Sequence, residues 1–93
     1  MIHIYYKLGL KGSDWIKLSE DGQLDNLVDT LRFLAVFATS DEMAGVNIFF
    51  KTQYKVVENG ETKFILSFKD KEAFTKTTDD LKRLVKELEK EEK

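Results

Sequence analysis

Hydrophobic and polar residues alternate most regularly between Val46 and Lys69, on both sides of the dipeptide Asn59-Gly60. Asparagine and glycine tolerate the positive φ angles that a tight type I′ turn requires, so this stretch predicts a β-hairpin. Side chains alternate between the two faces of a strand. One predicted face is therefore apolar and is formed by Val46, Ile48, Phe50, Tyr54, Val56, Phe64, Leu66 and Phe68. The other has four lysines and no carboxylate, and is formed by Asn47, Phe49, Lys51, Gln53, Lys55, Lys63, Ile65, Ser67 and Lys69.

A second alternating stretch begins the chain. Hydrophobic residues occupy the even positions from Ile2 to Leu10, which predicts a first strand with one apolar side. Gly12-Ser13-Asp14 is typical of a turn, and the run from Trp15 to Leu18 then predicts a short second strand with Ile16 and Leu18 facing inward. The alternative is that residues 9–18 form a loop.

Helical periodicity follows this stretch. Ser19 or Asp21 is placed to cap a helix that we expect to end near Thr39. Residues 40–45 are expected to link this helix to the hairpin, with Gly45 as a stop signal. A stripe of hydrophobic residues at helical spacing predicts the face that packs on the sheet: Leu24, Leu27, Val28, Leu31, Leu34, Ala35 and Ala38.

Asp70 is placed to cap a second helix that runs through Leu88 into the charged end of the chain. A break or a slow start is expected at three poor helix formers, Thr75, Thr77 and Thr78. The elements predict an α+β fold with a single layer of four mainly antiparallel strands and two helices on one face, in the order ββαββα. If residues 9–18 are a loop, the order becomes βαββα.

Two pairs of segments look alike, IHIYYK with VNIFFK and DTLRFL with DDLKRL. One interpretation is a duplicated ββα unit with a longer hairpin in the second copy. The other is chance similarity between amphipathic segments. Under the first interpretation, Tyr5 and Phe49 occupy equivalent positions on the sheet.

Length and composition fit one domain spanning residues 1–93, with 42% hydrophobic and 34% charged residues. The longest apolar run, Phe33 to Ala38, is far shorter than the roughly 20 residues of a membrane span. The first residues also lack the pattern of a signal peptide, so we expect a cytoplasmic protein without membrane contact. The absence of cysteine excludes disulfides and thiolate metal sites.

Charge is unevenly distributed, although the net charge is only −2. The predicted strands are basic, whereas the first predicted helix is acidic. Lysines neutralise phosphates and exposed aromatic rings stack on unpaired bases, so the open sheet face predicts binding of single-stranded DNA or RNA. The residues expected to contact the nucleic acid are Tyr5, Lys7, Trp15, Lys17, Phe49, Lys51, Lys55, Lys63 and Lys69.

Three other interpretations stay open. Lysine is common on solvated strands, where it discourages aggregation through strand edges. Phe33, Val36 and Phe37 lie away from the predicted core, so they are either covered by the second helix or form a patch for a protein partner or a dimer. The protein would then be an interaction domain, such as a viral or mobile-element inhibitor of a host nucleic-acid enzyme, or a homodimer formed through this patch or through the sheet face.

The acidic positions Asp21, Asp25 and Asp29 could imitate phosphates for such an enzyme, or be ordinary solvated helix surface.

Catalytic chemistry has little support. His3 is the only histidine and no cysteine is present, so neither a Cys-His pair nor a histidine-rich metal site can form. No serine lies in a nucleophile motif, and the glycines are scattered at predicted turns rather than gathered in a phosphate-binding loop. We therefore expect a non-enzymatic binding protein with no metal or cofactor.

Overall fold

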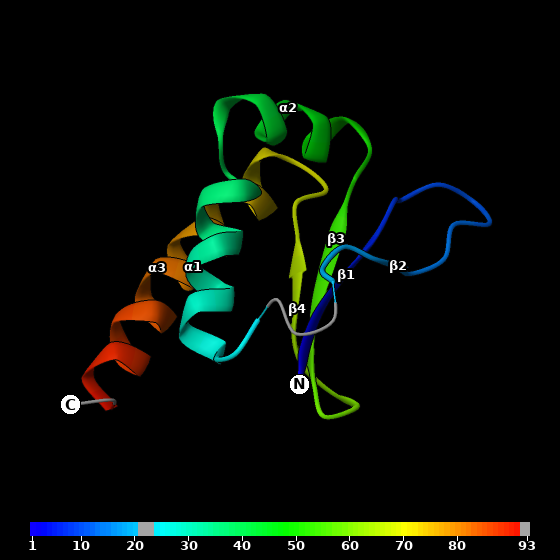
Figure 1. Cartoon of the computed structure of the whole chain (residues 1–93). Helices are drawn as coiled ribbons and strands as arrows, with labels where there is room; N and C mark the ends of the chain where they lie inside the picture. The colour runs from blue at the N-terminus through cyan, green and yellow to red at the C-terminus, as the bar shows by residue number, and fades with distance from the viewer. Residues whose placement is uncertain (21–23, 92–93) are drawn as a thin grey trace.

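The computed structural model describes residues 1–20 and 24–91 and shows an α+β fold (Figure 1). Four antiparallel strands form one sheet in the order β2-β1-β3-β4. Helices α1 and α3 cover one face of the sheet, and α2 lies across the end of the strands (Figure 1). In chain order the elements are β1 (Ile2–Lys7), β2 (Ile16–Lys17), α1 (Leu27–Phe37), α2 (Asp41–Phe49), β3 (Gln53–Glu58), β4 (Glu61–Ser67) and α3 (Lys71–Glu91). The predicted fold class is confirmed, with α2 as an additional helix.

The hairpin of β3 and β4 is confirmed at its turn. Asn59 and Gly60 both have positive φ angles, 52° and 82°, as a type I′ turn requires. Lys55 pairs with Ile65 and Val56 with Phe64, and the register shifts between Val56 and Val57. The two strands therefore present the predicted alternating faces over most of their length.

The core lies between this sheet and the two long helices. The side chain of Tyr54 is central, because its ring makes edge-on contacts with Phe37, at 6.4 Å between centroids, and with Phe68, at 5.6 Å. Alternate residues of β1 and β3 are buried at Ile2, Ile4, Tyr54 and Val56, as the alternation predicts, and the predicted stripe of α1 packs against them. The core cluster consists of Ile2, Ile4, Leu31, Leu34, Ala38, Tyr54, Val56, Leu66, Phe68 and Leu81.

The predicted second strand is present but short. Tyr5 pairs with Lys17 and Tyr6 with Ile16, and the N–H of Leu18 donates to the carbonyl of Ile4 at 2.7 Å. The alternative in which residues 9–18 are entirely a loop is therefore wrong. The prediction that Ile16 faces into the core is also wrong, because β2 lies at the sheet edge away from α1 and α3 and Ile16 is 51% exposed (Figure 1).

The largest error of the sequence prediction concerns residues 41–50. Val46 to Phe50 were expected to begin the hairpin, but they belong to α2 and its C-terminal cap. Ser40 begins this helix, because its Oγ accepts from the N–H of Met43 at 3.3 Å and its carbonyl accepts from Ala44 at 2.8 Å. Gly45 lies inside the helix instead of ending it. The match of IHIYYK with VNIFFK, on which the suggested ββα duplication partly rested, is wrong, since the first segment is a strand and the second is helix and turn.

Of the predicted caps of the two long helices, one is wrong and one is confirmed. Asn26, not Ser19, caps α1 by accepting from the N–H of Asp29 at 2.9 Å. The buried Ser19 hydroxyl instead accepts from the N–H of Ile4 at 2.9 Å, and Asp21 lies outside the described residues. Asp70 caps α3 as predicted, by accepting from Ala73 at 2.8 Å. No break occurs at the threonines of α3, because the helix runs continuously through them and two of their hydroxyls donate to backbone carbonyls.

Candidate nucleic-acid interface

The sheet face turned away from α1 and α3, called the open face here, is organised by the strand register. Lys17, Tyr5, Lys55 and Ile65 are neighbours across the four strands and form one row. The next row consists of Lys7, Gln53 and Ser67. Cross-strand neighbours on one face lie within reach of each other. The register thus gathers three lysines and one tyrosine into two adjacent rows that contain no carboxylate.

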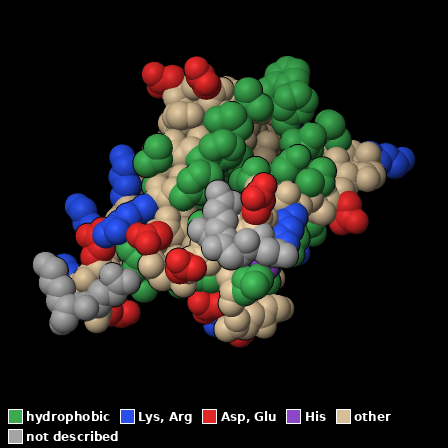
Figure 2. All heavy atoms as spheres, in the orientation of Figure 1, with side chains coloured by type: hydrophobic (Ala, Val, Ile, Leu, Met, Phe, Trp, Pro, Cys, Tyr) green, Lys and Arg blue, Asp and Glu red, His purple; other side chains and the backbone are tan. Residues whose placement is uncertain are grey.

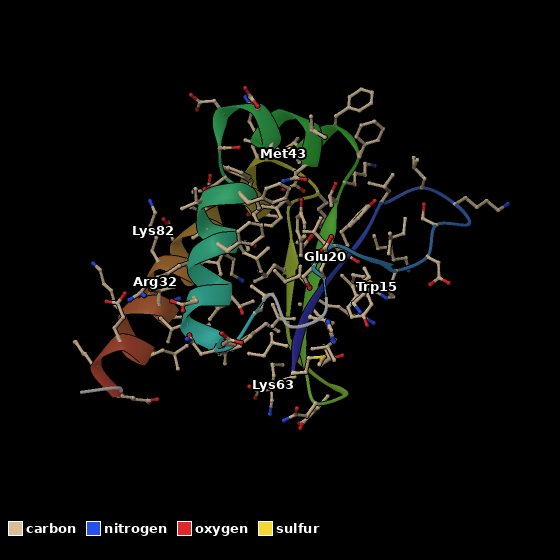
Figure 3. The ribbon with its side chains drawn as sticks, viewed as in Figure 1. Trp15, Glu20, Arg32, Met43, Lys63 and Lys82 are labelled. Atoms are coloured by element: carbon tan, nitrogen blue, oxygen red, sulfur yellow. The ribbon has the colours of Figure 1, made fainter. Side chains whose placement is uncertain are left out.

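Trp15 adds a second aromatic ring to these rows. The Lys55 Nζ lies 4.6 Å from the centroid of the Trp15 ring and 5.2 Å from that of Tyr5, so this ammonium group contacts both rings. The Lys7 Nζ also approaches the Trp15 ring, at 5.8 Å. Trp15 lies on the far side of the sheet from Arg32 and Lys82 (Figure 3). Lys55, Tyr5 and Trp15 are all half-buried, so this cation-π cluster holds the two rings in place.

The second row borders a depression at one end of the sheet, called the basic hollow here. It has a volume of about 430 Å³ and is lined by Lys7, Leu8, Gly9, Leu10, Lys11, Lys51, Gln53 and Lys69. No carboxylate is among these lining residues. Four of the chain's lysines therefore surround one space, and three of them, Lys7, Lys51 and Lys69, were among the contact residues predicted from the sequence.

Two predicted contact residues do not lie on the open face. Phe49 is at the end of α2 and is 78% exposed, with its ring edge-on to Phe50 at 4.9 Å. It is therefore not equivalent to Tyr5, and the prediction of its position is wrong. Lys51 is in the turn between α2 and β3, with a φ of 52°, rather than in a strand. Its side chain nevertheless lines the basic hollow.

The remaining predicted lysines are separated along the sheet. Lys69 follows β4 and lines the basic hollow. Lys63 lies near the hairpin turn at the other end of the sheet, and its Nζ is 3.3 Å from the Glu61 carboxylate (Figure 3). Because this lysine pairs with Glu61 at the hairpin end of the sheet, it does not extend the cluster around Tyr5.

The predicted protein-contact residues of α1 do not form one patch. The rings of Phe33 and Phe37 stack at 5.4 Å between centroids, and Phe37 packs against the core beside Tyr54. Val36 is 73% exposed and lies at the groove between α1 and α3, which is also lined by Val85. The second long helix thus packs beside α1 without covering Val36.

An apolar pocket that the sequence did not predict lies between α1, α2 and β1. Its volume is about 240 Å³, and its lining residues are Tyr6, Leu8, Leu18, Phe37, Met43, Val46, Asn47, Thr52 and Tyr54. Hydrophobic side chains gather over α2 and the neighbouring end of α1, whereas acidic and basic side chains predominate over the lower parts of α1 and α3 (Figure 2). The pocket was missed because residues 43–47 were assigned to a connection and a strand, although Ser40 followed by two acidic residues is a helix-start signal.

The polar floor of this pocket is a hydrogen-bonded pair. The Tyr54 hydroxyl donates to Asn47 Oδ1 at 2.7 Å, and Asn47 Nδ2 donates to the carbonyl of Ala38 at 3.0 Å. Asn47 is 1% exposed. Burial raises the pKa of the Tyr54 hydroxyl, and the hydrogen bond to Asn47 opposes that shift. The pair joins α1, α2 and β3, and so fixes α2 at the end of the sheet.

The acidic positions expected to imitate phosphates are partly neutralised. Asp29 accepts from Arg32 Nη1 at 3.2 Å, and Arg32 Nε also donates to Glu89 of α3 at 3.0 Å. The hydrogen bond to Glu89 raises the pKa of Arg32 further above its usual range. Asp25 precedes α1, and Asp21 lies outside the described residues. Of the described positions, Asp29 therefore belongs to an ion-pair network that joins α1 to α3.

Within residues 1–20 and 24–91, no group of three or more histidine, aspartate or glutamate side chains is arranged to hold a metal ion. None of the helices described is both long and hydrophobic enough to span a membrane. No protein-family model, curated protein or solved structure matches the chain significantly.

Proposed function

We propose that the protein binds single-stranded nucleic acid through the open face of its sheet. One observation carries the proposal: Lys55 lies between the rings of Tyr5 and Trp15, with Lys7 and Lys17 in the same two rows. Flat rings beside cations are the two features that non-specific single-strand binding needs, because bases stack on the rings and phosphates contact the cations.

The cation-π cluster also favours a particular order in which the contacts with the nucleic acid form. A phosphate that attracts the Lys55 ammonium group draws it away from the rings and uncovers surface on which a base can stack. Lys7 and Lys17 then contact the neighbouring phosphates. With about −0.7 in the logarithmic salt dependence for each phosphate contact on a single strand, three lysines give a slope of about −2.

The proposal is tested by filter binding of oligo-dT and of a mixed-sequence single-stranded RNA over a range of salt concentrations. Lys55→Glu should weaken binding strongly, whereas Lys82→Glu, the same charge change on the helix side of the sheet (Figure 3), should leave it nearly unchanged. Tyr5→Ala should lower the affinity at least about fivefold, since one stacked base contributes about 1–3 kcal/mol. Absence of saturable binding at low salt, or equal losses in the two charge variants, would refute the proposal.

A homodimer is the second candidate, and the apolar surface around α2 favours it. Val46 is 44% exposed and Phe49 is 78% exposed, beside the apolar pocket. Exposed apolar surface of this kind is typical of contacts between chains. Sedimentation at several protein concentrations tests it: Phe49→Asp should abolish a dimer while preserving oligonucleotide binding, and a monomer at all concentrations would exclude this candidate.

A further inference from the structure

Three segments that are distant in sequence meet at the basic hollow. Lys7 ends β1 and Lys11 follows it, Lys51 is in the turn before β3, and Lys69 comes directly after β4. Gln53 lies between them, paired with Lys7 on one side and Ser67 on the other. The hollow therefore combines four ammonium groups with one neutral amide, which can donate as well as accept hydrogen bonds.

The backbone beneath the hollow is closely packed. The N–H of Gly9 donates to the carbonyl of Phe50 at 2.8 Å, and a Cβ at this glycine would lie only 2.6 Å from the Cβ of Lys51. On the other side, the N–H of Phe68 donates to the carbonyl of Thr52 at 3.0 Å, and the Phe68 side chain is fully buried. Lys51 and Lys69 thus extend from backbone whose position is fixed by contacts on both sides.

Within residues 1–20 and 24–91, no ion pair neutralises a lysine of the hollow. Ion pairs form instead at Arg32, Lys63 and Arg83, away from the hollow. Asp70 is adjacent to Lys69 in sequence, but its carboxylate accepts from the N–H of Ala73 and caps α3. Repulsion among these like charges is relieved when an anion enters, so the hollow favours a ligand that carries several negative charges.

We infer that the basic hollow binds phosphate groups that are linked together, as in a nucleic-acid backbone or a free polyphosphate. Compact ammonium groups on flexible side chains contact phosphate oxygens as point charges and do not require one fixed ligand orientation. The hollow borders the row of Lys7 and Gln53, so a single nucleic-acid strand bound to the open face would continue into the hollow. The nucleic-acid source rests on the function proposed above, whereas the polyphosphate source does not.

Titration calorimetry with sodium tripolyphosphate and the full chain tests this inference. We expect saturable binding of one tripolyphosphate per chain, weakened at least about tenfold when Lys51→Gln and Lys69→Gln are combined, because two charge-assisted contacts are lost. The matched control combines Lys82→Gln and Lys86→Gln on α3, which removes the same charge and should preserve the affinity. Thermal unfolding of both double variants verifies that they fold. Equal affinities of the two double variants would overturn the inference, since binding would then follow the net charge alone.

Competition distinguishes the two sources. If tripolyphosphate displaces oligo-dT, and the combined Lys51 and Lys69 variant weakens both ligands, the hollow holds nucleic-acid backbone. If tripolyphosphate binds without displacing oligo-dT, the hollow holds a free polyphosphate. Failure of tripolyphosphate to bind overturns the inference, while binding of oligo-dT in the same experiment would leave the proposed function of the open face intact.

Discussion

Replacing Asn47 by leucine should destabilise the protein more than other polar-to-apolar changes of similar size. The variant keeps a side chain of comparable volume but removes the acceptor for the Tyr54 hydroxyl and the donor for the Ala38 carbonyl. A buried polar group that loses its partner costs about 1–3 kcal/mol, so the two groups together give about 2–6 kcal/mol. The adjacent pocket can admit water to the Tyr54 hydroxyl, which places the expected cost in the lower half of this range.

This loss is large compared with the whole stability of the chain. At roughly 0.05–0.15 kcal/mol per residue, 93 residues correspond to about 5–14 kcal/mol. Urea unfolding followed by circular dichroism measures the change directly. The matched control is Gln53→Leu, because the Gln53 side chain makes no hydrogen bond within the described residues and its replacement should stay within about 0.5 kcal/mol.

A double-mutant cycle separates the hydrogen bond from the packing. Tyr54→Phe should cost about 1 kcal/mol in the natural sequence. In the Asn47→Leu background it should cost nothing or stabilise the protein, because the hydroxyl it removes has already lost its partner. The reasoning is wrong if Asn47→Leu changes the stability by less than about 0.5 kcal/mol, or if Tyr54→Phe has the same effect in both backgrounds.

Two other predictions concern stability. Gly9→Ala should lower the free energy of unfolding by about 1–3 kcal/mol, because the added Cβ has no room beside Lys51. Gly45→Ala should raise it by about 0.5–1 kcal/mol, because Gly45 lies inside α2 with open space where the Cβ would be. Urea unfolding measures both changes, and equal effects would contradict the close packing at Gly9. The raised pKa of Tyr54 means that this hydroxyl ionises at a lower pH in the unfolded chain than in the folded protein. The stability that the neutral hydroxyl contributes is therefore complete below about pH 10 and is lost as pH rises through the folded-state pKa. Stability should therefore fall more steeply in alkali for the natural protein than for Tyr54→Phe, and identical slopes in urea unfolding at several pH values would contradict this.

The parts of the fold that were predictable are those with a local cause. The turn at Asn59-Gly60, the cap at Asp70 and the alternation of buried and exposed strand residues each follow from a few neighbouring residues. Residues 46–50 are less determined locally: Ser40 and the two acidic residues after it indicate where a helix starts, but VNIFF itself suits a strand as well as a helix, and contacts distant in sequence decide between them. The burial of Asn47 against Ala38 and Tyr54 is the contact that alternation alone could not reveal.

The candidate site was predictable to a similar extent. The alternation placed Tyr5, Lys7 and Lys55 on one face, and the strand register makes them neighbours. The error at Phe49 came directly from the error in α2. The basic hollow could not be predicted, because it depends on the close approach of Gly9 to Lys51, which joins two segments that are far apart in the chain.

The position of Trp15 has a practical consequence for studying the molecule. It is the only tryptophan in the chain, and its ring contacts the ammonium groups of Lys55 and Lys7. Its intrinsic emission therefore arises entirely from one place on the open face. A ligand that withdraws either ammonium group changes the electric field at the indole, so the unlabelled protein carries its own optical probe at the surface where we propose binding.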